Sequence, residues 1–188
     1  MPKIVDHNQY RQELLSQCVA LFAERGFGAV TMREIAASLG VSTGTLYHYF
    51  PNKKRIFEQL VETYCEKSVA EFFAQAPLAA SLESKLHRIK TFLLQRYSIY
   101  QQQFLIWIDF YQHSQRSHSQ DWTVLQQSWQ RSQSQLVDYL QVAPEQVDSL
   151  LIFLDGLLLQ CLYGRSEADI AQQTEIFMQM FEKACRSD

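Results

Sequence analysis

The chain has 188 residues, 47% of them hydrophobic, and a formal net charge of −3 at pH 7. A chain of this length can bury a substantial core and holds one domain or two small ones. The weakly negative charge argues against a protein that coats nucleic acid or anionic membranes. Residues 1–60 hold seven Lys or Arg against five Asp or Glu, whereas residues 61–188 hold ten against fifteen. The N-terminal part is therefore the basic part.

Compartment and membrane association can be judged from the cysteines and the apolar runs. The four cysteines form no C-x-x-C pair and read as reduced thiols, with redox sensing as the open alternative. They are Cys18, Cys65, Cys161 and Cys185. The most apolar run, residues 150–163, is too short to span a bilayer, and the N-terminus does not look like a signal peptide. We expect a cytoplasmic protein with no membrane partner.

In chain order, a helix is predicted from about residue 8 to 25 and is ended by Gly26. Two short helices follow. Thr31 and Glu34 have capping-box spacing, so a helix begins at Thr31. Gly40 then favours a C-terminus, and Ser42 begins the second short helix at once.

Two short helices across a tight turn predict a helix-turn-helix, whose second helix enters the DNA major groove. The same geometry also occurs in purely structural bundles. The second helix favours DNA because its exposed face is small or hydrogen-bonding, whereas a buried helix would carry more aliphatic residues. These side chains belong to Ser42, Thr43, Gly44, Thr45, Tyr47 and His48.

These residues belong to a longer pattern that resembles the DNA-binding domain of the TetR family of bacterial transcriptional regulators. The pattern runs Ala29-Val30-Thr31-Met32-Arg33-Glu34-Ile35-Ala36, Leu39-Gly40-Val41-Ser42, Gly44-Thr45-Leu46-Tyr47, Tyr49-Phe50 and Lys53. The resemblance covers about residues 8–60. It implies a dimeric, all-α repressor whose operator affinity changes when a small molecule binds the C-terminal domain. Members often carry acidic residues just after the lysine, whereas this chain has Lys54 and Arg55.

We therefore predict contacts to double-stranded DNA, with an inverted-repeat operator as the partner. Phosphate contacts are expected from Thr31, Arg33, Tyr47, Lys53 and Lys54, and base contacts from Thr43, Thr45 and His48. Ser42 and Gly44 complete the predicted interface. Cations at the start of a helix oppose its dipole, and a bound phosphate would remove that penalty.

Helical periodicity continues to the end of the chain, so the predicted fold is all-α. Helices are expected at about residues 52–75, from Ser81 or Ser84 to 100, at 104–111, 122–140 and 145–164, and from Ser166 or Asp169 onward. The helix 104–111 is apolar nearly all round and should be buried. We predict a helix-turn-helix domain at residues 1–60 and a helical ligand-binding and dimerisation domain at residues 61–188.

The last two helices are the predicted interface of a homodimer, because one of them is apolar on several faces and so needs more than one partner. Filling of all these faces within one chain is the alternative. The predicted interface consists of Leu150, Phe153, Leu154, Leu157, Cys161, Phe177 and Met180.

Aromatic residues are dense between positions 92 and 129, which predicts a site for an apolar or aromatic effector, with a solidly packed core as the alternative. The predicted pocket residues are Phe92, Tyr97, Phe104, Trp107, Tyr111, Trp122 and Trp129.

Common catalytic and phosphate-binding motifs are missing from the sequence, so we expect neither an enzyme nor a cofactor. Asp109, His113 and His118 could hold a divalent metal, but incidental histidines at a polar helix end are the favoured interpretation, and no metal site is predicted. The main alternative function is a helical ligand-binding or adaptor protein without DNA readout.

Overall fold

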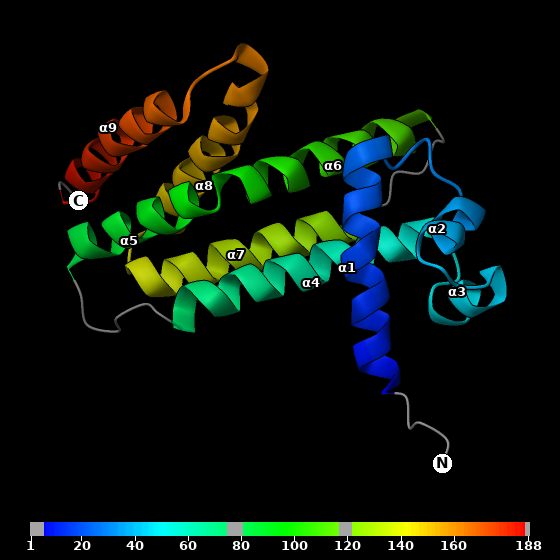
Figure 1. Cartoon of the computed structure of the whole chain (residues 1–188). Coiled ribbons are helices and arrows are strands. Elements are labelled where there is room, and N and C mark those ends of the chain that lie inside the picture. The colour runs from blue at the N-terminus through cyan, green and yellow to red at the C-terminus, as the bar shows by residue number, and fades with distance from the viewer. Residues whose placement is uncertain (1–5, 75–80, 117–121, 187–188) are drawn as a thin grey trace. The chain divides into compact units, whose positions relative to one another are not determined.

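The computed structural model describes residues 6–74, 81–116 and 122–186 (Figure 1). The described residues form helices joined by short turns, and no strand occurs among them. The helices are α1 (His7–Arg25), α2 (Met32–Ser38), α3 (Thr43–Tyr49), α4 (Lys53–Ala74), α5 (Leu82–Gln95), α6 (Tyr97–Arg116), α7 (Thr123–Leu140), α8 (Pro144–Leu158) and α9 (Glu167–Cys185), with a 3-10 helix, η1 (Leu159–Tyr163), after α8. The all-α prediction is confirmed. None of the described helices has the length and apolar content needed to cross a membrane.

Polar caps begin most of these helices where the sequence predicted. The Thr31 hydroxyl accepts the Glu34 amide at 3.3 Å, while a Glu34 carboxylate oxygen accepts the Thr31 amide at 2.8 Å. Ser81, not Ser84, caps α5, and Ser166 caps α9. Such caps satisfy backbone N–H groups that have no partner within the helix.

Two predictions for the middle of the chain are wrong. The helix expected to end at residue 100 ends at Gln95, and α6 then runs without a break from Tyr97 to Arg116. The segment 104–111 is not buried all round, because the exposed fractions of Leu105 and Tyr111 are 41% and 49%. Spacings of three and four residues give α6 one inward face, which also carries the buried polar residues Gln103 and Ser114.

The chain divides into two compact units. The first unit comprises Met1–Tyr64 and Leu105–Leu125, and the second comprises Cys65–Phe104 and Gln126–Asp188. The first unit thus includes the C-terminal half of α6 in addition to the segment predicted as a domain. Helices α4, α6 and α7 each contribute residues to both units.

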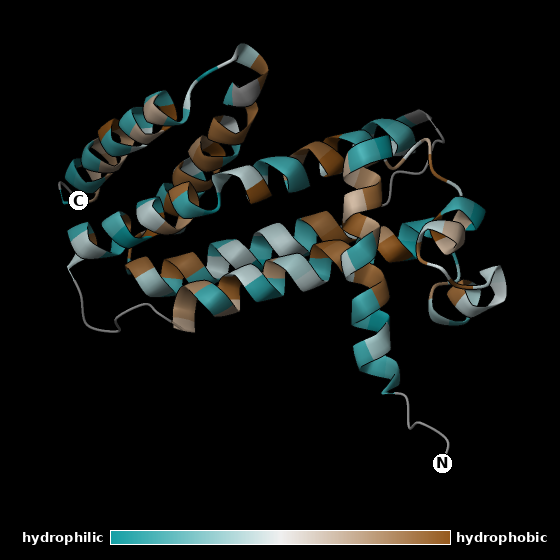
Figure 2. Ribbon diagram, in the orientation of Figure 1, coloured by the Kyte–Doolittle hydropathy of each residue, from teal (hydrophilic) through white to brown (hydrophobic). Residues whose placement is uncertain are grey.

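Each unit has its own apolar core. In the first unit, Phe22, Leu46, Phe50 and Phe57 are at most 1% exposed. In the second, α5 packs against α9, and α8 supplies the fully buried Val147 and Leu150. Helix α8 is largely hydrophobic, whereas α3 is mostly neutral to hydrophilic (Figure 2). The composition of α8 therefore favours burial in a core, whereas that of α3 favours contact with solvent or with a polar partner.

Candidate nucleic-acid interface

Helices α2 and α3 form the predicted helix-turn-helix. Gly40, whose φ is +66°, turns the chain between them, and the Val41 amide donates to the Ala36 carbonyl at 3.0 Å. The inner side of α3 is anchored by Leu46, which is fully buried. Because one side of this short helix is fixed in the core, its other side is held outward in a defined orientation.

The outward side of α3 is polar and accessible. Tyr47 is 49% exposed, and His48 is also exposed. Thr43 and Thr45 are half-buried, while Gly44 is exposed. Except for Gly44, these residues carry side-chain groups that donate or accept hydrogen bonds, as direct reading of base edges requires. Their roles as DNA contacts remain predictions.

The hydroxyl groups of Ser42 and Thr31 make hydrogen bonds that cap the helices. The Ser42 hydroxyl accepts the Thr45 amide at 3.0 Å and lies 2.8 Å from the Thr45 hydroxyl. The Thr31 hydroxyl donates to a Glu34 carboxylate oxygen at 2.7 Å, and this bond and the Thr31 amide hold the pKa of Glu34 below its usual value. Both hydroxyls fix the helix starts, whereas Arg33 is exposed on the first turn of α2.

Lys53 makes contacts within its own chain, and its predicted phosphate contact stays a prediction. Its ammonium donates to the carbonyl oxygens of Phe27 at 2.6 Å and Val30 at 2.7 Å, and lies 4.4 Å from the centre of the Phe27 ring. Burial lowers the pKa of Lys53, and the Asp109 and Glu34 carboxylates oppose that shift. An ammonium has three donors, so these carbonyls use most of them. In this structure Lys53 ties the segment between α1 and α2 to the start of α4.

Charge at the start of α4 is compensated within the helix itself. Glu58 accepts from Arg55 at 3.1 Å and lies 3.5 Å from the Lys54 ammonium. The Asn52 side chain accepts the Arg55 amide at 2.8 Å and so begins the helix. A phosphate is therefore not required to explain the two cations, although both side chains stay partly exposed.

The segment between α1 and α2 is also held by α6. Asp109 Oδ2 accepts the Gly28 amide at 3.1 Å. A Cβ at Gly26, whose φ is +80°, would come within 3.1 Å of that same oxygen, and a Cβ at Gly28 within 3.1 Å of His113. Glycine at both positions allows α6 to approach this closely.

Asp109 and His113, which the sequence offers as possible metal ligands, make other contacts in the structure. Asp109 is used by Gly28, and the His113 ring lies edge-on to Phe27 with centroids 5.5 Å apart. His118 lies outside the described residues. Among the residues that the structure describes, no group of three or more His, Cys, Asp or Glu is placed to hold a metal ion.

Two of the residues predicted for the dimer interface are buried within their own chain. Leu150 and Leu157 are 0% and 4% exposed, because they fill the core of their own chain. Phe153 and Phe177 are half-buried and stack on each other with centroids 3.7 Å apart, and Leu154 is half-buried in the core. Met180 is 64% exposed, and the side chain of Cys161 lies outside the description.

Other apolar residues of α8, η1 and α9 are exposed, and they are not among the residues predicted for the interface. Their exposed fractions are 69% for Ile152, 65% for Leu162, 76% for Tyr163 and 44% for Ile176. Together with Met180 they come from α8, η1 and α9.

The seven residues predicted to line an effector pocket are divided between the two units. Trp107, Tyr111 and Trp122 belong to the first unit and the other four to the second. Tyr97 is buried, and its hydroxyl donates to the Leu157 carbonyl at 2.9 Å; Phe92 and Phe104 pack against cores, and Trp129 is 39% exposed. Tyr97, Phe92 and Phe104 are therefore packed core residues, which is the alternative that the sequence left open.

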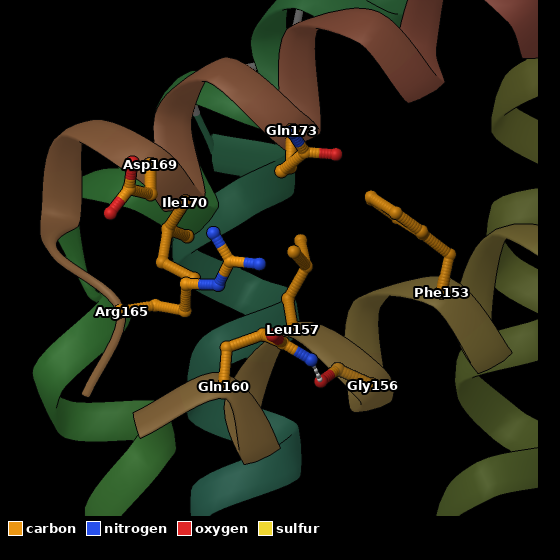
Figure 3. A pocket seen from close by; sticks show the side chains of 8 residues that line it. All are labelled: Phe153, Gly156, Leu157, Gln160, Arg165, Asp169, Ile170 and Gln173. Atoms are coloured by element: carbon orange, nitrogen blue, oxygen red, sulfur yellow. Dashed lines mark hydrogen bonds between the residues drawn. The ribbon is translucent and has the colours of Figure 1, made fainter. Parts of the chain in front are cut away.

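A pocket of about 280 Å³ lies elsewhere, between α8 with η1 and α9 (Figure 3). It is lined by both apolar and polar residues, namely Phe153, Gly156, Leu157, Gln160, Arg165, Asp169, Ile170 and Gln173. The side chains of Arg165 and Leu157 extend into the same space (Figure 3). None of the seven predicted residues lines this pocket.

Comparison with known proteins supports the assignment of the N-terminal segment. Residues 14–60 match the model of a family described as bacterial regulatory proteins, tetR family. Over 65 residues the chain is 38% identical to the HTH-type transcriptional repressor KstR2 of Mycobacterium tuberculosis, which covers 35% of this chain and 32% of that repressor. The chain therefore matches its curated relatives over only about a third of their length.

Solved structures are similar over nearly the whole chain. A transcriptional regulator from Rhodococcus sp. Rha1 is 20% identical, with a TM-score of 0.75, over 93% of this chain and 96% of that one. A protein from Saccharomonospora viridis, solved in complex with choline, is 21% identical, with a TM-score of 0.74, over 92% of this chain and 97% of that one. At these identities the likeness concerns the fold, including the helical second part.

Proposed function

We propose that the chain, whose residues 14–60 match the tetR family of bacterial regulatory proteins, is a sequence-specific DNA-binding transcriptional regulator that represses from an inverted-repeat operator. The observation that carries this proposal is the polar outward face of α3, held by the buried Leu46 and Phe50. The same face weighs against an adaptor protein, which would need an apolar surface at this position.

The test is selection of bound sequences from random DNA, followed by affinity measurement over a range of salt concentrations. A dimer making several phosphate contacts should show a log–log slope of roughly −4 to −8. Exchanging Thr45 for Ala should relax discrimination at one position of the selected site, because Thr45 belongs to the polar side of α3 predicted to contact bases. An interaction independent of salt, or selection without an inverted repeat, would contradict the proposal.

We further propose that the regulator is a homodimer joined through α8 and α9. One short recognition helix contacts too few base pairs to specify a unique site in a genome. A two-fold axis places two such helices about 34 Å apart, which doubles the number of base pairs contacted. The exposed apolar residues Ile152, Ile176 and Met180 support this interface. Sedimentation should give a dimer at micromolar concentration.

We also propose that a small apolar or aromatic effector binds the second unit and lowers operator affinity. Support comes from the pocket between α8 and α9, which is lined by both apolar and polar residues, as ligand sites generally are. The Saccharomonospora viridis protein, which has the same fold, was solved with choline. A coupling of about 1–3 kcal/mol would lower DNA affinity about 5- to 150-fold.

The effector proposal can be tested with a compound screen that reads thermal stability and operator release in parallel. Compounds that raise the melting temperature and release DNA support it, and substituting Gln160 and Gln173 by Ala should weaken their binding, since both line the pocket. Compounds that bind without changing operator affinity would count against it.

A further inference from the structure

The N-terminal turn of α1 lies against the C-terminal end of the recognition helix α3. His7, the first residue of α1, makes a 2.8 Å hydrogen bond through its Nδ1 with the hydroxyl of Tyr49. Its ring centroid is 6.3 Å from that of His48, and both histidines are exposed. Arg11, one turn further along α1, donates to the Tyr49 backbone carbonyl at 3.1 Å. The two ends are thus joined by specific contacts.

This arrangement leaves one imidazole nitrogen available beside the outward face of α3. Nδ1 is used by Tyr49, while Nε2 makes no hydrogen bond to any residue that the structure describes. A protonated imidazole donates from both nitrogens, so His7 could keep its bond to Tyr49 and donate from Nε2 to a phosphate oxygen. The Tyr49 hydroxyl would then accept from Nδ1.

Charged and titratable groups of α1 and α3 lie near His7. On α1 the neighbouring acid is Asp6, whose carboxylate accepts the amides of Asn8 and Gln9, and the neighbouring cation is Arg11. Helix α3 contains no carboxylate and contributes His48. A DNA phosphate oxygen that accepts from Nε2 favours the protonated form of His7, because a nearby opposite charge stabilises a cation.

We propose that His7 is an additional DNA contact of this protein, and that it takes up a proton from solution when DNA binds. This rests on the proposed function and extends the interface beyond the helix-turn-helix to the start of α1. By linkage, a group that gains a proton on binding makes the affinity rise as pH falls. Operator affinity therefore increases from pH 8 to pH 6.

The experiment measures the affinity of the full chain for its selected operator by fluorescence anisotropy, from pH 6 to pH 8 at constant ionic strength. A dimer carries two copies of His7, so the affinity of the wild type should rise by about 10-fold or more toward pH 6. His7→Gln should bind at pH 6 nearly as it binds at pH 8. His7→Lys, which carries a permanent charge, should bind at pH 8 about as tightly as the wild type at pH 6.

Salt dependence gives a second readout that a purely structural role would not move. At pH 6 the log–log slope of the wild type should be steeper than that of His7→Gln by about 1.8, the value for two phosphate contacts per dimer. His87→Gln is the matched control, because His87 is an exposed histidine on α5 in the second unit. It should leave both the pH dependence and the salt slope unchanged. Circular dichroism checks that each variant is folded.

The outcomes separate this inference from the proposed function. If the chain binds no DNA sequence selectively at any pH, the proposed function fails. If it binds an operator but His7→Gln keeps the pH dependence and salt slope of the wild type, the function stands and the role of His7 is refuted. A pH dependence lost only in His48→Gln would also refute it. A parallel loss in His7→Gln and gain in His7→Lys supports it.

Discussion

Replacing Lys53 by Met should destabilise the first unit substantially, because Lys53 is an internal tie. Met keeps most of the aliphatic stem but removes the ammonium that donates to the carbonyls of Phe27 and Val30 and lies over the Phe27 ring. Hydrogen bonds from a charged donor contribute about 1.5–3 kcal/mol each, and a cation–π contact about 0.5–1 kcal/mol at a partly exposed site.

The net loss should be smaller than the sum of these contributions. Lys53 is half-buried, and removal of its charge also recovers the cost of burying it, the effect that lowers its pKa. We expect the free energy of unfolding to fall by about 2–4 kcal/mol, measured by urea denaturation. The corresponding fall in melting temperature is roughly 5–12 °C for a chain of this size.

Lys54→Met is the matched control, since it makes the same exchange at the next position. Its ammonium lies 3.5 Å from Glu58 in a partly exposed pair, and such pairs contribute about 0–1 kcal/mol. A loss below about 1 kcal/mol for Lys53→Met, or equal losses for both variants, would refute the assignment of Lys53 as an internal tie. Lys53 would then be a surface cation like its neighbour.

Three further predictions concern recognition, assembly and pH. Thr45→Ala should relax discrimination at one operator position by about 1–3 kcal/mol, whereas Arg33→Ala should weaken all sequences about equally, as anisotropy on matched and mismatched sites can show. Ile152→Glu should give monomers in sedimentation, while Gln172→Glu on the exposed side of α9 should not. Partial desolvation of the carboxyl raises the pKa of Asp155 to about 6, above its unfolded value, so the free energy of unfolding falls as pH rises through that range. Asp155→Asn should therefore stabilise the chain at pH 7.5 and make no difference below about pH 4; the residue stays exposed, so the gain should be less than about 1 kcal/mol.

The features that local chemistry determines could be predicted from the sequence. The capping box at Thr31 depends on residues three positions apart, and the starts of α3 and α9 depend on Ser42 and Ser166 in the same way. Each such signal is complete within one turn of helix, so tertiary contacts do not alter it. The resemblance to a known family then predicted the order of these helices and the helix-turn-helix that they form.

The roles of Lys53 and Asp109 could not be predicted in this way. The acceptors of Lys53 are backbone carbonyls more than twenty positions earlier in the chain, and backbone carbonyls leave no trace in the residue types. Asp109 likewise accepts the amide of a glycine 81 positions away. In sequence, a cation at a helix start resembles a phosphate contact, and an acid near two histidines resembles a metal ligand. Only the third dimension distinguishes these alternatives.

The dimer prediction shows how much a hydrophobic pattern can specify. Residues apolar on several faces of α8 indicate that several faces need apolar neighbours, and they do not say which neighbour each face receives. Leu150 is fully buried, yet Ile152, two positions later and on the opposite face, is 69% exposed. Leu and Ile have side chains of the same size and similar hydrophobicity, so residue type alone does not predict which of the two is buried. Because the face that carries Leu150 packs in one core with residues of α5 and α9, we expect the proposed partner on the face that carries Ile152, and substitutions on these two faces should affect folding and assembly separately.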